Sequence, residues 1–196
     1  MSYFEPKAGG IMPPVVKNIL IINGLLFLAT MVLLEQGVNL YKIFAWHDSN
    51  DFKIWQPISY MFMHADFGHI FFNMFGVWMF GIQLENLWGP KRFLNYYLLT
   101  GLGAGIIHFM LFDGSLVGAS GSLMGLLLAF GVIFPNARLL FLFFPVPIKA
   151  KYFVILYGIG ELYYGFTSDG NIAHFAHIGG MLIGFLILKY WKWKNK

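Results

Sequence analysis

The long apolar runs of this chain constrain its fold more than any other feature. A helix that crosses a bilayer needs roughly 17–25 mostly apolar residues. Hydrophobic residues make up 58% of the 196-residue sequence and charged residues only 11%, far less charge than a soluble chain carries. We therefore predict an all-α fold, a polytopic membrane bundle of six transmembrane helices. The six predicted spans are 16–34, 67–88, 93–112, 119–134, 148–166 and 171–191.

The sequence predicts a single membrane domain over residues 1–196, with no internal repeat. Residues 1–14 are expected to be a short cytoplasmic segment, and Glu5 with nearby prolines interrupts any cleavable signal there. Residues 35–66 form the longest connection, whose aromatic residues predict an outer loop lying in the membrane interface. The span 119–134 is short, which predicts a central helix shielded by its neighbours.

Basic residues are distributed unequally between the predicted connections. Eleven of the 13 Lys and Arg residues fall on the side that holds both termini, and only Lys42 and Lys53 fall on the other. The positive-inside rule therefore predicts a multi-pass protein with both termini in the cytoplasm. The positive-inside distribution accounts for the net charge of +4, so this charge is not interpreted as a nucleic-acid-binding surface, and no nucleic-acid partner is predicted.

Three of the predicted spans bring polar side chains to a similar depth below the outer face. His69 and Asn73 lie in the first turns of one span, Ser120 begins another, and His177 lies about two turns into the last. Polar groups inside a membrane are costly, so each is a functional candidate. A neutral imidazole can remove the proton of a serine hydroxyl, which makes Ser120 a candidate nucleophile and His177 a candidate base.

The surrounding residues provide donors and space for this chemistry. His69 and Asn73 are spaced i,i+4 and share a helix face. Together with Gly118 and the backbone N–H of Ser120 they are the predicted contributors to oxyanion stabilisation. Gly121 and Gly180 with Gly184 are predicted to pack two helices closely at the site. A packing role for Ser120 is the alternative for a lone serine, but the polar side chains at matching depth favour catalysis.

At these residues the sequence resembles the rhomboid family of intramembrane serine proteases, in its six-span bacterial form. The matching motifs are Gly118-Ala119-Ser120-Gly121, His69 to Asn73, and Ala176-His177 followed by Gly179, Gly180 and Gly184. The resemblance implies a Ser–His dyad without an acidic third member, in a protein of the bacterial cytoplasmic (inner) membrane. It also implies transmembrane protein substrates that are cleaved near their outer end.

The sequence departs from the family pattern at two positions. Many rhomboids carry a Trp-Arg pair in the outer loop, where this chain has Gln56 after a Trp. Met124 stands four residues after Ser120, where an aromatic residue often stacks on the base. Neither departure changes the dyad, although both leave the surrounding packing open.

The remaining polar residues have structural interpretations. His174 and His177 are spaced i,i+3, but a zinc protease would need His-Glu-x-x-His, and the chain has no Cys, so we predict no metal and no cofactor. Glu161 is a possible third member of a catalytic triad, although a structural pairing with a neighbouring helix is favoured.

Glu85 is expected to tie its helix to the basic turn at 91–92. His64 and His174 are expected to form hydrogen bonds near the outer surface, and His108 has no assigned role.

Two other functions compete with proteolysis. A non-catalytic rhomboid-like protein would bind or escort membrane proteins, but such proteins usually lack the serine or the histidine. A transporter would place its polar site at the midplane between broken helices, which this sequence does not suggest. For a protease, the span 148–166 is the expected substrate gate, because it combines Gly158 and Gly160 with bulky Phe153 and Tyr157.

Overall fold

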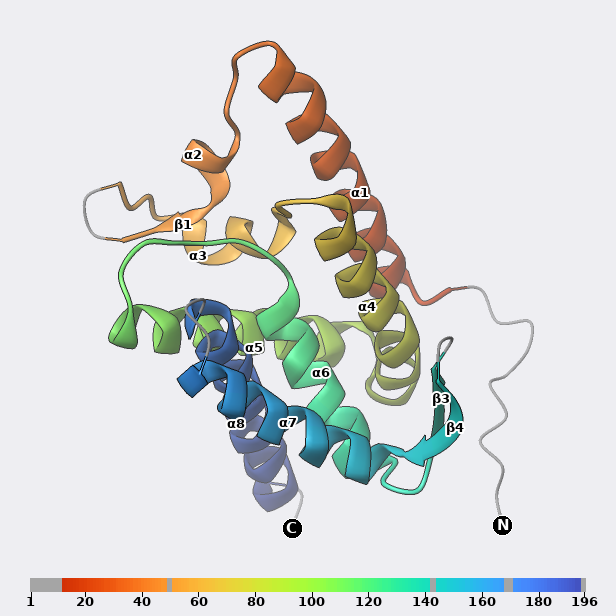
Figure 1. Ribbon diagram of the computed structural model, residues 1–196. Coiled ribbons are helices and arrows are strands. Elements are labelled where there is room, and N and C mark those ends of the chain that lie inside the picture. Colours follow the sequence, from red (N-terminus) through yellow and green to blue (C-terminus); the bar gives the residue numbers. More distant parts are fainter. Residues whose placement is uncertain (1–11, 49–50, 142–143, 168–170, 195–196) are drawn as a thin grey trace.

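The computed structural model describes residues 12–48, 51–141, 144–167 and 171–194. Most of these residues are helical (Figure 1). Each long helix matches a predicted apolar segment to within a few residues, so the predicted helical bundle is confirmed. The predicted segment 1–14 lies almost wholly outside the described residues. The long helices are α1 (Pro14–Glu35), α4 (Phe67–Trp88), α5 (Pro90–Leu111), α6 (Ser120–Ile133), α7 (Ala150–Thr167) and α8 (Asn171–Lys194).

The outward faces of the helices are apolar. In the described part of the chain, α1, α4 and α5 are each long and apolar enough to cross a membrane. Large side chains such as Leu25 and Leu28 of α1 and Ile155 and Leu156 of α7 are exposed, at 58–62% of their surface. A soluble monomer rarely exposes so much contiguous apolar surface, which indicates that lipid covers it. The count of six spans stays a prediction, since α6 has only 14 residues.

The long helices alternate in direction, so their ends gather at two opposite ends of the bundle. The start of α1 contacts the end of α4, where backbone N–H groups of Val15 and Val16 donate to Glu85. Trp88, the last residue of α4, packs edge-on against Trp191 near the end of α8, with ring centroids 5.3 Å apart. The first residues of α4 and α6 lie at the opposite end, where the polar residues of the predicted site are found.

Glu85 has a different structural role from the one predicted. Its carboxylate is 2% exposed and accepts from the N–H groups of Val15 at 2.9 Å and Val16 at 2.7 Å. These groups have no partner inside α1, and the positive end of the helix dipole favours a carboxylate there. Glu85 therefore caps α1 and does not tie α4 to the basic turn. In that turn, Arg92 instead lies over the ring of Trp191, 3.9 Å from its centre.

Helix α6 lies in the middle of the bundle, as predicted (Figure 1). It packs against α4, α5, α7 and α8, and ten of its 14 residues are buried. Small residues let the neighbours approach: a Cβ at Gly125 would lie 2.7 Å from Thr100 of α5, and one at Gly131 would lie 2.5 Å from Val154 of α7. Shielding by protein on all sides explains why a short helix suffices here.

The outer loop is more structured than the sequence predicts. Between α1 and α4 it forms α2 (Tyr41–Phe44), β1 (Trp46–His47), α3 (Gln56–Ser59) and the 3-10 helix η1 (Tyr60–Phe62). Strand β1 pairs antiparallel with β2 (Ser115–Leu116), which precedes α6, so that Trp46 lies opposite Leu116. This pairing ties the loop to the segment that leads into Ser120.

Gln56 organises this loop from a fully buried position. Its Oε1 accepts from the backbone N–H of Lys53 at 3.0 Å and of His47 at 3.3 Å, and its Nε2 donates to the carbonyl of Asp51 at 3.3 Å. The amide thus bonds backbone groups on both sides of the loop.

The link between α6 and α7 forms a β-hairpin that the sequence analysis missed. Strand β3 (Arg138–Phe141) pairs antiparallel with β4 (Phe144–Lys149), with Arg138 opposite Lys149 and Leu139 opposite Ile148. Two prolines lie in 144–149, and proline cannot donate to a ladder. A two-stranded sheet has only edge strands, which tolerate proline because one side of each strand needs no partner.

Candidate active site

Ser120 is the first residue of α6 and is half-buried. The preceding turn requires glycine at position 118, whose φ is +114°. The N–H of Gly118 donates to the carbonyl of Tyr60 at 2.9 Å, which fixes the turn against η1. Because Ser120 begins the helix, its own N–H has no intrahelical partner and lies at the positive end of the helix dipole.

His69 stands directly against this turn. A Cβ at Gly118 would lie 2.6 Å from Nε2 of His69, so only glycine leaves room for the imidazole. Asp66 caps α4 by accepting from the His69 N–H at 2.8 Å, and Nδ1 of His69 faces the N–H of Ala65 at 3.4 Å. An Nδ1 that accepts places the proton of a neutral ring on Nε2, on the side of Gly118. His69 is thus oriented to donate beside the turn that leads into Ser120.

Asn73 lies one turn below His69 on α4. Its side chain is 4% exposed, and its Nδ2 donates to the His69 carbonyl at 2.9 Å. That bond uses one of the two Nδ2 hydrogens. The structure therefore places His69 and Asn73 on one face of α4, as their spacing predicts.

Helices α6 and α8 cross beside Ser120 and His177. A Cβ at Gly180 would collide with the carbonyl oxygen of Gly121, and one at Gly184 would lie 3.3 Å from the Cα of Gly125. Ser120 immediately precedes Gly121, and His177 lies about one turn before Gly180. His177 is half-buried and close enough to His69 for the two rings to interact electrostatically. The four polar residues singled out from the sequence thus border one region of the bundle.

A carboxylate lies beside the predicted base. Oε2 of Glu161, on α7, is 3.0 Å from Nδ1 of His177 and 2.7 Å from Nδ1 of His174. The predicted pairing of Glu161 with a neighbouring helix is confirmed. The neighbouring helix is α8, so a carboxylate lies against His177, which the expected dyad without an acidic third member did not include.

These three residues also form a possible ligand set for a metal ion. Their ligand atoms lie within 4.8 Å of one another. Two imidazoles and a carboxylate suit Zn²⁺ chemically. However, the two Nδ1 atoms and the carboxylate already satisfy one another by hydrogen bonds, so the arrangement needs no ion. The absence of a catalytic metal stays a prediction.

His64 is a site residue that the sequence analysis underestimated. Although it was expected near the surface, it is 1% exposed and packs edge-on against His69, with ring centroids 4.9 Å apart. Its Nε2 faces the N–H of Ala119, immediately before Ser120, at 3.5 Å. Burial, and secondarily the neighbouring His69, lower the pKa of His64 from 6.5 to about 4. His64 therefore packs as a neutral ring behind the nucleophile turn.

His108 and Met124 have packing roles. His108 is fully buried on α5 and lies edge-on to Phe109, with ring centroids 4.6 Å apart. Met124 is 5% exposed and belongs to the main core cluster. Both positions are thus explained by burial.

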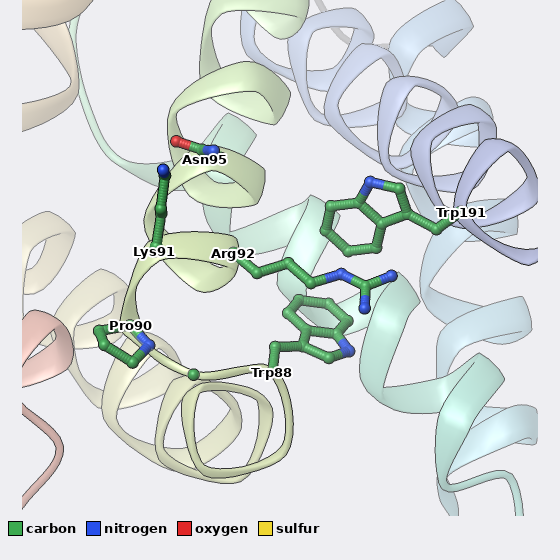
Figure 2. A pocket seen from close by; sticks show the side chains of 7 residues that line it. Trp88, Pro90, Lys91, Arg92, Asn95 and Trp191 are labelled. Carbon is green, nitrogen blue, oxygen red and sulfur yellow. The ribbon is translucent and has the colours of Figure 1, made fainter. Parts of the chain in front are cut away.

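A separate pocket lies at the opposite end of the bundle (Figure 2). Its volume is about 530 Å³, and the guanidinium group of Arg92 lies over the indole ring of Trp191, beside Trp88. Helix α4 has 22 residues between its start, beside His69, and Trp88, which corresponds to about 33 Å at 1.5 Å per residue. This pocket contains no group that could act as nucleophile or base with Ser120, so it is not the candidate active site. Its lining residues are Trp88, Gly89, Pro90, Lys91, Arg92, Asn95 and Trp191.

Comparison with known protein families covers the segment that holds the candidate site. The family model described as the rhomboid domain matches residues 51–193, which include His69, Ser120 and His177. The chain belongs to the rhomboid family. This rhomboid is therefore an integral membrane protein, in agreement with its apolar outer faces.

Curated relatives of this rhomboid come from distant organisms. It is 32% identical to "Rhomboid protease GluP" of Bacillus subtilis over 67% of this chain and 25% of that protein. It is 30% identical to "Rhomboid protein 1, mitochondrial" of Saccharomyces cerevisiae over 66% of this chain and 39% of that protein. It is 24% identical to "Rhomboid protease GlpG" of Yersinia pestis over 93% of this chain and 64% of that protein. The chain spans about two fifths of the length of the first relatives it matches.

Proposed function

We propose that this rhomboid is an intramembrane serine endopeptidase with Ser120 as nucleophile and His177 as base. The observation that carries the proposal is the close crossing of α6 and α8 at Gly121 and Gly180, which brings together the helix segments that hold these two residues. Family membership supports the same reaction, since two of the relatives are named as proteases. The expected substrates are transmembrane proteins cut near the outer face of the bilayer.

The proposed reaction begins with proton transfer from the Ser120 hydroxyl to Nε2 of His177. The Ser120 oxygen then attacks the scissile carbonyl carbon and forms a tetrahedral intermediate. When this intermediate collapses, the bond to the leaving nitrogen breaks and His177 returns its proton to that nitrogen. Water, activated by the same imidazole, hydrolyses the acyl-enzyme and regenerates Ser120.

Three donors are proposed to stabilise the oxyanion. They are Nε2–H of His69, which lies against Gly118, the N–H of Ser120 at the start of α6, and the second Nδ2 hydrogen of Asn73. The predicted contribution of Gly118 needs correction, because its N–H already donates to Tyr60. We assign Gly118 the role of making room for the His69 ring.

The proposed orientation follows from the basic residues. Six spans, with both termini in the cytoplasm, place Ser120 and His177 towards the outer face. A bacterial cytoplasmic (inner) membrane is the proposed location, and the proposed partners are the lipid bilayer and a transmembrane substrate, without nucleic acid. The alternative function is a non-catalytic rhomboid-like binder, which would need neither Ser120 nor His177.

The test of this proposal is covalent labelling of the purified protein with a fluorophosphonate probe. An activated serine attacks the probe, so the native chain should be labelled and Ser120→Ala should not. Labelling should persist in excess EDTA, because no metal takes part. No labelling of the folded native chain, or equal labelling of Ser120→Ala, would overturn the proposal in favour of a binding function.

A further inference from the structure

Glu161 connects helix α7 to the proposed base. Its carboxylate is 7% exposed, and one oxygen, Oε2, faces Nδ1 of both His177 and His174. The hydroxyl of Tyr157, one turn earlier on α7, is a further hydrogen-bond partner of the carboxylate. A buried carboxylate with three donors has its position fixed from two helices.

These contacts determine which nitrogen of His177 carries the proton. An ionised carboxylate only accepts hydrogen bonds, so Nδ1 of His177 must donate. A neutral imidazole has one N–H, and Nε2 is then left with a free lone pair. A lone pair on Nε2 is what a base needs to remove the proton of the Ser120 hydroxyl.

The contacts also restrict the orientation of the imidazole ring. Helix α8 packs against both α7 and α6. A ring held through Nδ1 to Glu161 of α7 turns its Nε2 edge away from α7. On the other side, α8 packs against α6 where Gly180 meets Gly121, and Ser120 is the residue before Gly121 at the start of α6. The same hydrogen bond that fixes the tautomer thus also favours the productive rotamer.

We propose that Glu161, supplied by α7, is a positioning residue that holds His177 for the Ser120–His177 dyad. This inference rests on the proposed protease function. The proton removed from the Ser120 hydroxyl stays on Nε2 of His177 until it passes to the leaving nitrogen. Glu161 takes up no proton, but its negative charge stabilises the imidazolium while it exists.

His174 provides the matched control for this role. It shares Oε2 with His177 but lies about one turn earlier on α8 and is not proposed to move a proton. Losing His174 should leave the carboxylate bound to His177 and Tyr157. A purely structural role of the cluster would make Glu161 and His174 equally important, whereas the positioning role makes Glu161 far more important.

The first arm of the test is kinetic and uses the full-length protein in proteoliposomes. Glu161→Gln keeps the size of the side chain but removes its charge and introduces a donor that favours the wrong tautomer. It should lower kcat by about 10²–10⁴-fold with little change in KM, by analogy with loss of the carboxylate in other serine protease triads. Glu161→Asp should restore part of kcat, and His174→Gln should stay within about tenfold of the native rate, less than the cost of one lost catalytic donor.

The second arm is spectroscopic and needs no variant of Glu161. In native protein with ¹⁵N-labelled histidine rings, the His177 signals, assigned by their loss in His177→Gln, should show a protonated Nδ1 and an unprotonated Nε2. A proton on Nε2, an unchanged kcat in folded Glu161→Gln, or equal losses in Glu161→Gln and His174→Gln would each overturn the inference. Failure of the proposed function itself would be recognised separately, by missing fluorophosphonate labelling of the native chain.

Discussion

At the scale of single residues, the hydrogen-bond partners of His69 and His177 favour opposite tautomers of the two rings. Nδ1 of His69 faces a backbone N–H, so its Nε2 donates, whereas Nδ1 of His177 faces a carboxylate, so its Nε2 accepts. One ring is thereby suited to stabilise an oxyanion and the other to accept a proton. Neighbouring groups, more than the residue type, distinguish the two roles.

Asn73→Ala should slow proteolysis without abolishing it. Loss of one oxyanion donor costs on the order of 10²–10³-fold in kcat, while His69 and the Ser120 N–H still donate. The measurement is turnover of a transmembrane substrate at saturation, with thermal unfolding as a check on the fold. An unchanged kcat would show that Asn73 has only a packing role.

His64 should make the protein less stable in acid. Its pKa is about 4 in the folded chain and 6.5 in an unfolded one, so the unfolded state binds the proton first as pH falls. The resulting loss of folding stability is absent above pH 6.5 and grows as the pH falls towards 4. At 1.36 kcal/mol per pKa unit, the difference between 6.5 and about 4 corresponds to at most about 3 kcal/mol. Between pH 7 and pH 4 the His64→Gln protein should therefore lose less stability than the native chain, as measured by thermal unfolding in detergent. Parallel curves would contradict this account.

At the scale of elements, the site depends on how closely α6 and α8 approach. Gly180→Ala places a Cβ on the Gly121 carbonyl, so the helices must separate and the dyad should be disrupted. We expect a loss of about 1–3 kcal/mol of stability, as for other overpacked positions, together with most of the activity. Gly160→Ala on α7 is the matched control, because nothing lies within 4 Å of its Cβ position. Similar effects of both substitutions on unfolding and turnover would refute the tight crossing.

Helix α7 is the proposed gate for substrates, but its aromatic residues have more than one role. Phe153 and Tyr157 pack against each other, with ring centroids 5.8 Å apart, and Tyr157 also supports Glu161. Any substitution of Tyr157 would therefore confuse gating with chemistry, so the better variant is Phe153→Ala alone. It should raise cleavage of a transmembrane substrate severalfold more than cleavage of a short soluble peptide. Tyr163→Ala, on the exposed side of α7, is the control, and equal changes for both substrates would place entry elsewhere.

At the scale of the whole molecule, apolar length predicted the helices well, and local motifs predicted the residues around the site. The contacts that complete the site could not be predicted in this way. Glu161 and His177 are 16 residues apart on different helices, and spacing alone does not say which faces of two lipid-embedded helices meet. The capping role of Glu85 was missed for the same reason, since its partners are 69 and 70 residues away. Long-range polar contacts thus depend on packing, which the sequence pattern does not contain.

The central claim, a catalytic dyad on α6 and α8, is tested most directly by cleavage of a transmembrane substrate in proteoliposomes. The native chain is compared with Ser120→Ala, His177→Ala and the double variant, each shown to be folded by thermal unfolding. Residues that act as one unit lose activity non-additively, so each single variant should lose at least about 10³-fold in turnover and the double variant no more. Turnover by either single variant within about tenfold of the native rate would contradict the dyad, because one lost catalytic donor alone costs more than that.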